Sequence, residues 1–466
     1  MQHKTAYLWG LIGRFAPQGL NLVTTIVLAR FLTPDDFGTI GVLSVIFIVA
    51  NTLLDSGLGG SLVKEKEVSE VDCSTIFVFN VSVSLTIYLL LFLGANAIEN
   101  YFNITNLSDI VRTLSLVFVL SAFGIVPKAM LDRKLAFRTS CNNSIVGSFV
   151  ASIVAIISAL LNAGIYSLVL YQLTEAAVTV MCNYYSSKYR FSLRFSFISL
   201  KRLLPFGVTT TITSVIDTIY ENLLTTMTGK YLSVQQAGYL YQSKRIEGVS
   251  SSSIAKTIGI VSFPILTKLK DNTTAFVTEA QKTFELIIAL ISPILITLAI
   301  HSYAVITLLF GKEWYDAGAY LRVLAITGLF IVAETLVRFF IKALCEVRKL
   351  LYITMIKRAI GIGLILATLL SNPEYMIYAY AVSAAVGLVL NVIVYRKITA
   401  VSIGLLLMSF LRKIIPCIVY FVLFFVLHLS NYGIVIQILY SVVFLSIIYL
   451  LMLRRPGFKI KSIIKK

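Results

Sequence analysis

The sequence has little charge, few cysteines and almost no histidine, and these shortages exclude several kinds of protein. Only 13% of its 466 residues are Asp, Glu, Lys or Arg, whereas soluble globular domains contain about 25%. The five cysteines are scattered without a CxxC or Cys/His spacing, so they do not indicate a zinc site or a disulfide framework. The three histidines are isolated as well. We therefore expect neither a metal ion nor a cofactor.

Motifs of catalysis are also missing. The sequence contains no glycine-rich phosphate loop, no GxSxG and no HExxH, and we therefore do not expect an enzyme. A membrane-embedded glycosyltransferase or polymerase usually carries a large loop outside the membrane. The longest such loop expected here is the short segment NAIENYFNITNLSD, which argues against that class.

Long hydrophobic runs are what the sequence does have. Apolar residues make up 58% of the chain, and its mean hydropathy is +0.88. The runs are roughly 17–25 residues long, which is the length of helix that crosses a bilayer. Because the runs do not alternate as barrel strands do, we expect an all-α polytopic membrane protein. About fourteen spans are predicted, at 6–29, 38–58, 74–95, 110–127, 144–161, 165–185, 203–228, 239–265, 284–308, 317–341, 352–371, 375–395, 414–429 and 434–453.

Positive charge gathers on one side of these predicted spans. The formal net charge is +18, which by itself invites a nucleic-acid partner. Most of the cations fall, however, in alternate connections between spans, and the positive-inside rule then places both termini in the cytoplasm. The charge thus reports topology, and no nucleic acid is needed to explain it. The cytoplasmic set includes Lys128, Arg133, Lys134, Arg138, Arg348, Lys349, Lys357 and Arg358.

Two segments 200 residues apart indicate an internal repeat. LARFLTPDDFGTIG at 28–41 aligns with TGKYLSVQQAGYLY at 228–241, matching Arg30 with Lys230 and Gly38 with Gly238. Each copy follows the first span of a six-span half, and an even number of spans gives both halves the same orientation. We expect a bundle at 1–200 and a second bundle at 201–400, related by a pseudo-two-fold axis along the membrane normal. Two further spans and a basic tail occupy 401–466.

Polar residues form stripes inside the first span of each half. In the first half, Arg14, Gln18, Asn21 and Thr25 recur at helical spacing. In the second half, the stripe includes Ser214, Asp217 and Glu221. We expect both stripes to face a cleft between the halves, because polar groups at membrane depth usually face a bundle interior or water. The alternative for Arg14 is that it snorkels to the cytoplasmic interface.

The next predicted span, which begins YLYQSKRIEGVSSSSIAK, is unusually polar. Lys244, Arg245, Ser252 and Lys256 lie on or beside one face of it, and we expect them to line a hydrated, cationic cavity. Lys244 and Arg245 are near the outer end, so snorkelling is the alternative for both. Lys256 lies deeper in the span.

Three carboxylates and one arginine inside the spans leave two explanations open. Glu334 and Arg338 stand four residues apart, so they either line the cavity or neutralise one another. Asp217, Glu221 and Glu334 serve either ion coupling or structural pairing with the cavity cations. The sixth span adds the polar residues Gln172 and Glu175.

Three stretches resemble one known family. LARFLTPDDFGTIGVLSVIFIVANTLLDSGLGGSLV (28–63), FGKEWYDAGAYLRVLAITGLF (310–330) and AGYLYQSKRI followed by SFPIL are similar to blocks of the polysaccharide transporter (Wzx-type flippase) family of the MATE-like (MOP) flippase superfamily. Many members place an acidic residue and IGK directly before the loop after the seventh span. Here the segment reads ENLLTTMTGKYL, so no role carries over to Glu221.

The resemblance implies a flippase of the bacterial inner membrane. Its substrate would be an undecaprenyl-diphosphate-linked oligosaccharide unit for O-antigen, capsule or exopolysaccharide assembly, moved by alternating access through a cationic central cavity. The implied partners are this lipid-linked substrate, membrane lipids, and a polymerase and chain-length regulator of the same pathway. The alternative is a cation-coupled multidrug or metabolite antiporter of the same superfamily, for which an acidic, aromatic cleft is expected.

Overall fold

The computed structural model describes residues 2–55, 58–65, 67–189, 193–251, 262–263, 265–344, 347–399, 403–426, 440–441 and 443–447. Throughout these residues the regular structure is helical, and the expected all-α fold class is confirmed. Nine stretches within the described part of the chain are long and apolar enough to cross a membrane. The protein is therefore a multi-pass membrane protein, and the count of about fourteen spans stays a prediction.

The helices of the first half are α1 (Gln2–Leu28), α2 (Pro34–Asp55), α3 (Leu58–Lys64), α4 (Glu70–Phe102), α5 (Leu107–Leu114), α6 (Leu116–Arg133), α7 (Phe137–Leu160), α8 (Tyr166–Ser187) and α9 (Phe197–Tyr231). Those that follow are α10 (Val234–Ser250), α12 (Thr273–Ile300), α13 (Ser302–Phe310), the 3-10 helix η1 (Lys312–Trp314), α14 (Ala317–Ala343), α15 (Val347–Ser371), the 3-10 helix η2 (Pro373–Tyr375), α16 (Met376–Thr399) and α17 (Ile403–Val426).

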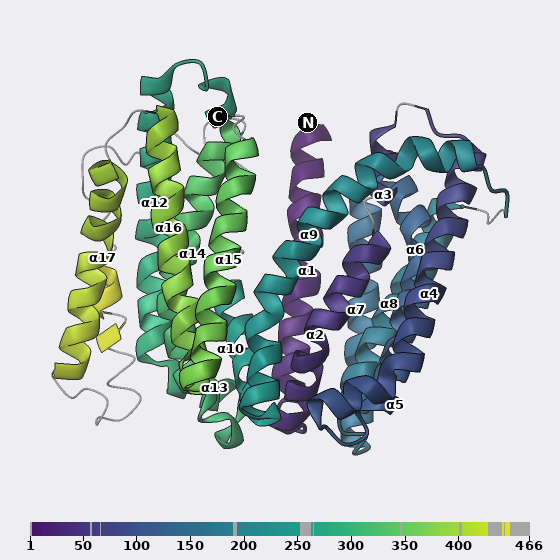
Figure 1. The fold of residues 1–466 in the computed structure, drawn as a ribbon, viewed down its shortest axis with the longest axis horizontal. Coiled ribbons are helices and arrows are strands. Elements are labelled where there is room, and N and C mark those ends of the chain that lie inside the picture. The colour runs from purple at the N-terminus through teal and green to yellow at the C-terminus, as the bar shows by residue number, and fades with distance from the viewer. Residues whose placement is uncertain are drawn as a thin grey trace. The chain divides into compact units, whose positions relative to one another are not determined.

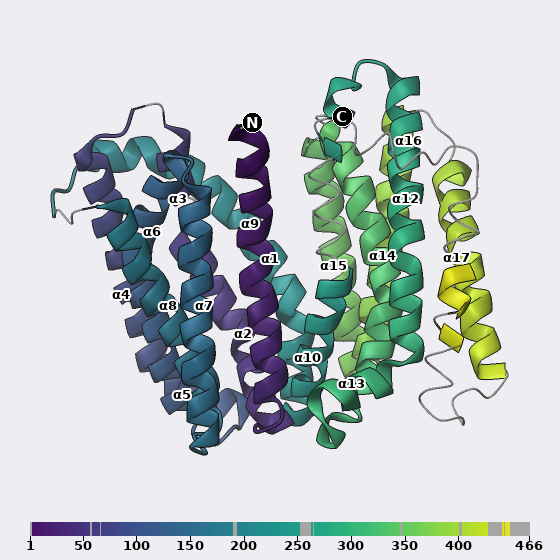
Figure 2. The same cartoon turned by 180° about the vertical axis from the view of Figure 1, so that it is seen from behind.

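The chain divides into two compact units. The first unit comprises Met1–Gly238 and Leu309–Glu313, and the second comprises Tyr239–Leu308 and Trp314–Lys466. In the first unit α7 packs between α1 and α8, α6 packs on α4 and α8, and α2 packs along α9 (Figures 1 and 2). In the second unit α14 packs on α12 and α16, and α15 and α17 complete the bundle. The predicted boundary between the halves, at residues 200 and 201, stays a prediction.

Hydrogen bonds at the start of α4 and α9 show why α9 belongs to the first unit. The Ser69 hydroxyl accepts from the backbone N–H of Asp72, and the backbone N–H of Ser69 donates to a carboxylate oxygen of Asp72, which completes a capping box at the start of α4. The other carboxylate oxygen of Asp72 accepts from Arg202 of α9 at 2.7 Å. The backbone N–H of Ser196, the cap of α9, donates to Thr75 of α4 at 3.0 Å. These bonds fix the beginning of α9 on α4.

Segments at equivalent positions of the predicted repeat contact each other reciprocally inside the first unit. A Cβ atom added to Gly38 would overlap the carbonyl oxygen of Val234, and one added to Gly238 would overlap the carbonyl oxygen of Pro34. The two glycines are 200 residues apart, and so are Pro34 and Val234. A contact in which each partner repeats the other's part is what a two-fold axis generates. The backbones of α2 and α10 meet here without any side chain between them, which only glycine permits.

A second pair of contacts follows the same pattern. Arg30, in the loop after α1, donates from Nε to the carbonyl oxygen of Leu309 at 3.1 Å. Lys230, its repeat partner at the end of α9, donates to the carbonyl oxygen of Tyr101 and lies 4.5 Å from the centre of that ring. In both cases a cation neutralises the carbonyl end of a helix, where the helix dipole is negative. In both contacts the cation stands at an equivalent position of the predicted repeat, and the axis between the halves stays a prediction.

We expect Gly38→Val to destabilise the protein, because the new side chain must force α2 and α10 apart. Overpacking of a close-packed site costs typically about 1–3 kcal/mol. The measurement is the midpoint of thermal unfolding of the purified protein in detergent. Unfolding is followed by intrinsic fluorescence, or by size-exclusion chromatography after heating.

Gly94→Val is the matched control, since Gly94 lies within α4 and a Cβ atom there would meet nothing within 4 Å. Equal midpoints for the Gly38 and Gly94 variants would contradict the close approach described above. Gly238→Val is expected to behave as Gly38→Val, because the contact is reciprocal.

Candidate functional site

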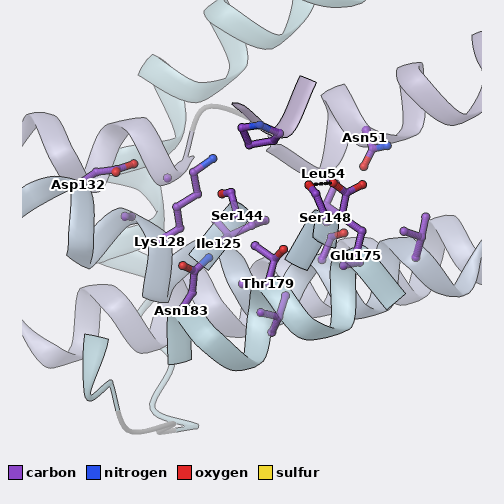
Figure 3. Close-up of a pocket in the computed structure, with 18 of the residues that line it drawn as sticks. Asn51, Leu54, Ile125, Lys128, Asp132, Ser144, Ser148, Glu175, Thr179 and Asn183 are labelled. Atoms are coloured by element: carbon purple, nitrogen blue, oxygen red, sulfur yellow. Dashed lines mark hydrogen bonds between the residues drawn. The ribbon is translucent and has the colours of Figure 1, made fainter. Parts of the chain in front are cut away.

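A polar cavity of about 940 Å³ lies within the first unit, between α1, α2, α3, α6, α7 and α8 (Figure 3). Its size falls in the range of small-molecule binding sites, roughly 300–1,000 Å³. Hydroxyl groups on its wall come from Thr52, Ser121, Ser144, Ser148 and Thr179, and amide groups come from Asn51, Gln172 and Asn183. The charged groups are Lys128, Asp132 and Glu175.

Glycines shape the walls of this cavity. A Cβ atom on Gly124 of α6 would lie 2.7 Å from Cγ2 of Val180, and one on Gly147 of α7 would overlap the Thr179 hydroxyl. Both α6 and α7 therefore approach α8 more closely than larger residues would allow. Gly13, Gly59 and Gly60 also line the cavity.

Glu175 is held in place by a chain of hydrogen bonds between helices. Its carboxylate accepts from the Ser148 hydroxyl of α7 at 2.6 Å (Figure 3). The carbonyl oxygen of Ser148 accepts from the Ser152 hydroxyl at 2.6 Å, and Ser152 in turn accepts from Thr24 of α1 at 2.6 Å. Helices α8, α7 and α1 are thereby connected. The Glu175 carboxylate thus lies inside a membrane-spanning helix and accepts a hydrogen bond from a donor of the protein.

Asn183 marks another part of the wall. Its side-chain oxygen accepts from Nδ2 of Asn143 at 2.9 Å, and Ser186 lies 3.2 Å from the same donor. Asp132 and Lys128 stand four residues apart on α6, on the same face of that helix. With all three charged groups ionised, one lysine faces two carboxylates, and the cavity has a net charge of −1.

The structure places the predicted polar stripe of α1 in two settings. Gln18 is exposed, whereas Asn21 donates from Nδ2 to the Tyr171 hydroxyl of α8 at 2.8 Å. Thr25 is buried and donates to the carbonyl oxygen of Asn21 at 2.7 Å. Both side chains therefore make hydrogen bonds inside the first unit. Arg14 lies in α1, and its side chain is outside the described residues.

The stripe predicted on α9 is described only at its end. Ser214 and Asp217 lie in the helix, with side chains outside the described residues, and Glu221 is exposed. On α10, Lys244 lies 5.6 Å from the ring centre of Tyr380, and Arg245 is half-buried. Ser252 and Lys256 are outside the described residues. The expected cavity lining by these residues stays a prediction.

Glu334 has a different partner from the expected one. Its carboxylate pairs with Lys357 of α15, and Arg338, four residues away on α14, does not form the bond. Lys357 and Arg358 were expected in a cytoplasmic connection; that expectation is wrong, because both lie inside α15 and are buried, at 9% and 7% exposure. The sequence feature that indicates this burial is a pair of adjacent cations inside an apolar run.

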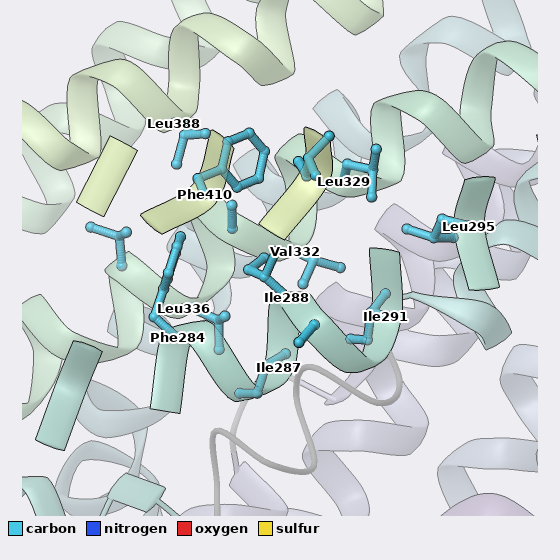
Figure 4. Packing of buried hydrophobic residues seen from close by; sticks show 14 of the residues in the cluster. Phe284, Ile287, Ile288, Ile291, Leu295, Leu329, Val332, Leu336, Leu388 and Phe410 are labelled. Carbon is cyan, nitrogen blue, oxygen red and sulfur yellow. The ribbon is translucent and has the colours of Figure 1, made fainter. Parts of the chain in front are cut away.

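A large cluster of apolar side chains forms the core between α12, α14 and α17 of the second unit. Phe284, Ile287, Ile288 and Ile291 of α12 pack against Leu329, Val332 and Leu336 of α14, and Phe410 of α17 covers them (Figure 4). The ring of Phe410 lies 6.4 Å from that of Phe284 and 6.0 Å from that of Phe330. This packing explains why α12 and α14 read as continuous apolar runs.

Among the described residues, no three His, Cys, Asp or Glu side chains come close enough to hold a metal ion.

Residues 27–319 match the family described as polysaccharide biosynthesis protein. The chain belongs to this family. The family assignment agrees with the resemblance seen in the sequence blocks at 28–63 and 310–330.

Curated relatives of the chain come from several bacteria. The lipopolysaccharide biosynthesis protein WzxC of Escherichia coli K12 is 27% identical over 325 residues, covering 69% of this chain and 66% of WzxC. The teichuronic acid biosynthesis protein TuaB of Bacillus subtilis is 24% identical over 285 residues, covering 60% and 59%. The succinoglycan biosynthesis transport protein ExoT of Rhizobium meliloti is 23% identical, covering 68% and 65%. The chain thus spans somewhat less than two thirds of these relatives.

Solved structures establish the fold. The lipid II flippase MurJ in an inward closed conformation is similar with a TM-score of 0.75 at 14% identity, covering 96% of this chain and 98% of MurJ. An inward-facing multidrug resistance MATE transporter of the MOP superfamily is similar with a TM-score of 0.64 at 14% identity, covering 84% and 98%. The chain shares its fold with these two structures.

The cavity of the first unit is expected to contain water. In a variant without its five native cysteines, Ser144→Cys should react with a maleimide, because a thiol ionises only where water reaches it. Val146→Cys is the matched control, since Val146 lies on the same helix and is 45% exposed on its outer, membrane-facing side. The measurement is the rate of labelling in membrane vesicles, and equal rates at both positions would contradict a hydrated cavity.

Proposed function

We propose that the protein is a flippase that moves undecaprenyl-diphosphate-linked oligosaccharide units across the bacterial inner membrane. The observation that carries the proposal is the polar cavity among membrane-spanning helices of the first unit. Its hydroxyl and amide groups suit the hydroxyl groups of sugars, which both donate and accept hydrogen bonds. The family match and the named roles of WzxC, TuaB and ExoT support the same function.

The physical need for such a cavity follows from the substrate. A diphosphate with several sugars cannot cross hydrocarbon, because each polar group would lose its hydrogen bonds to water. A flippase must therefore provide a wet path for the head, while the prenyl chain stays in the lipid. Alternating access between the two repeats supplies this path without opening a continuous pore. The protein binds and reorients its cargo, and no chemical step is part of the proposal.

The cations expected from the sequence complete the proposed path. Arg14, Lys244, Arg245, Lys256 and Arg338 are proposed as contacts of the diphosphate, for which forked guanidinium and point-like ammonium groups are suited. Gln18, Asn21, Thr25, Ser214 and Ser252 are proposed as its polar surroundings. Both termini are proposed to lie in the cytoplasm, and a polymerase and a chain-length regulator of the same pathway are proposed partners.

A strain that lacks the protein is expected to accumulate lipid-linked repeat units on the cytoplasmic face and to lose its surface polysaccharide. Complementation with Ser144→Phe should restore much less export than the wild type, since the ring would occupy part of the cavity that is proposed to hold the sugars. Export is measured as surface polysaccharide and as the pool of lipid-linked units in extracted membranes.

Arg245→Ala combined with Lys256→Ala should also fail to restore export.

Val146→Phe is the matched control, because it adds the same ring to the outer side of α7. Membrane levels of each variant are measured in the same cells, so that loss of protein is separated from loss of transport. Full export by Ser144→Phe at normal protein levels would end the proposed role of the cavity.

A cation-coupled antiporter is the second candidate function. The net charge of −1 in the cavity, from Asp132 and Glu175 against Lys128, favours it. Asp217, Glu221 and Glu334 remain proposed coupling groups of such a mechanism. Increased drug susceptibility of the deletion strain, with normal surface polysaccharide, would support the antiporter over the flippase.

A further inference from the structure

The beginning of α9 presents a surface on which apolar and cationic side chains alternate. Phe197 is 71% exposed and Ile198 is 84% exposed, and both stand in the first turn of the helix. Leu193 and Phe195, just before the helix, are exposed as well. The exposed cations of the same segment are Arg194, Lys201 and Arg202. We call the exposed side chains of residues 193–202 the α9 surface.

The other face of this segment is fixed to the first unit. Leu203 is 1% exposed and belongs to an apolar cluster with Ile76 of α4 and Val126 of α6. The two hydrogen bonds between α9 and α4 described above hold the same segment in place. Since a helix turns by about 100° per residue, Ile198 points away from the side on which Leu203 is buried. The α9 surface therefore faces outward from a rigid support.

The beginning of α9 also runs in a different direction from the rest of the bundle. It lies across the end of the first unit, against α3 and α4, whereas the later part of α9 runs along α2 (Figures 1 and 2). Because α4, α6 and α7 are long and apolar enough to cross the membrane, a helix that lies across their ends follows the membrane surface. The positive-inside rule predicts that this is the cytoplasmic surface. A helix in that position inserts its apolar side chains among the acyl chains and keeps its cations at the headgroups.

The neighbouring connections make this end of the unit positive. Arg133 at the end of α6 donates to the carbonyl oxygen of Leu62 in α3 at 2.9 Å, and this bond joins the connections 64–72 and 128–138 beside the α9 surface. Together with 188–204, they contain eleven Lys and Arg against five Asp and Glu, a net charge of +6. Segment 188–204 itself has no acidic residue. Anionic phospholipids attract basic residues at a membrane surface, whereas zwitterionic lipids have no net charge to match them. Charge complementarity thus selects an anionic lipid.

We propose that the α9 surface binds anionic phospholipids of the leaflet in which it lies. Phe197 and Ile198 enter the acyl layer, and Arg194 and Lys201 contact the lipid phosphates. Arg202 keeps its bond to α4 and holds the segment in place. These lipids are not cargo, because they bind outside the polar cavity and remain in their leaflet. The inference goes beyond the proposed function and does not depend on it.

The test follows the environment of residue 198 in the full-length protein. In a variant without the five native cysteines, Ile198→Cys carries the fluorophore NBD, whose emission shifts to the blue when water leaves its surroundings. The protein is placed in nanodiscs of phosphatidylcholine alone or of an equal mixture of phosphatidylcholine and phosphatidylglycerol. Emission should lie further to the blue with phosphatidylglycerol, and high salt should reverse the difference, because salt screens the attraction.

Two paired variants separate the α9 surface from positive charge in general. Arg194→Gln with Lys201→Gln removes two charges from the surface and leaves Arg202 in place, so most of the blue shift should be lost. Lys268→Gln with Lys270→Gln removes two exposed charges from the second unit, and the full shift should remain. An equal loss in both pairs would overturn the site.

Leu161→Cys is the matched position for the label, since Leu161 is 76% exposed and directly follows the last residue of α7. It lies at the other end of that helix from the connection 128–138, so its emission should be the same in both lipid mixtures. An equal shift at positions 161 and 198, or none at position 198, would contradict the proposal.

A second measurement needs neither a label nor the removal of cysteines. Phosphatidylglycerol added to the purified wild-type protein in detergent should raise the midpoint of thermal unfolding more than phosphatidylcholine does, because a ligand that binds the folded state stabilises it. The Arg194 and Lys201 pair of substitutions should abolish this difference, and the Lys268 and Lys270 pair should preserve it. No difference in the wild type, or one that survives the Arg194 and Lys201 pair, would refute the lipid site whatever the labelled protein shows.

Discussion

A charged side chain inside a membrane-spanning helix needs a partner within the protein, and this requirement organises both units. Hydrocarbon supplies no hydrogen bonds, so each carboxylate, ammonium or guanidinium group at depth must meet a counter-ion, a polar neighbour or water. Glu175 meets the Ser148 hydroxyl at the edge of a cavity, and Glu334 meets Lys357 in a packed interior. The two solutions give the two units different properties.

Glycine decides which solution each unit adopts. Gly124 and Gly147 let α6 and α7 close on α8, and the small residues on the opposite wall leave a volume that polar groups surround. In the second unit Gly387 instead admits the side chain of Lys357, and the ion pair fills the space between α14, α15 and α16. One unit thus keeps a cavity with polar groups on its wall, and the other keeps a buried ion pair packed between three helices.

Much of the fold can be predicted from the sequence, because the bilayer fixes the length and composition of the helices that cross it. The repeat is legible too, since Gly38 and Gly238 stand at equivalent positions and touch each other's helix. The partners of the buried charges cannot be predicted from the sequence in the same way. Helical spacing leaves two explanations for Glu334 and Arg338, and neither includes Lys357, whose ammonium pairs with Glu334 from 23 residues away on another helix. Lys357 and Arg358 fall inside the predicted span 352–371 but are counted with the cytoplasmic cations, because cations near the end of an apolar run usually report topology.

The site residues show the same division between local and non-local information. Spacing alone identified the polar faces of α1 and α8, and Gln172 and Glu175 of α8 do line the cavity. Spacing does not say which neighbour a polar residue meets, and Asn21 uses its amide on Tyr171 within the bundle. A polar stripe is therefore evidence that a helix is not surrounded by lipid, but it does not distinguish a binding surface from a buried hydrogen bond. The distinction depends on volume, and volume depends on the glycines of the helices opposite.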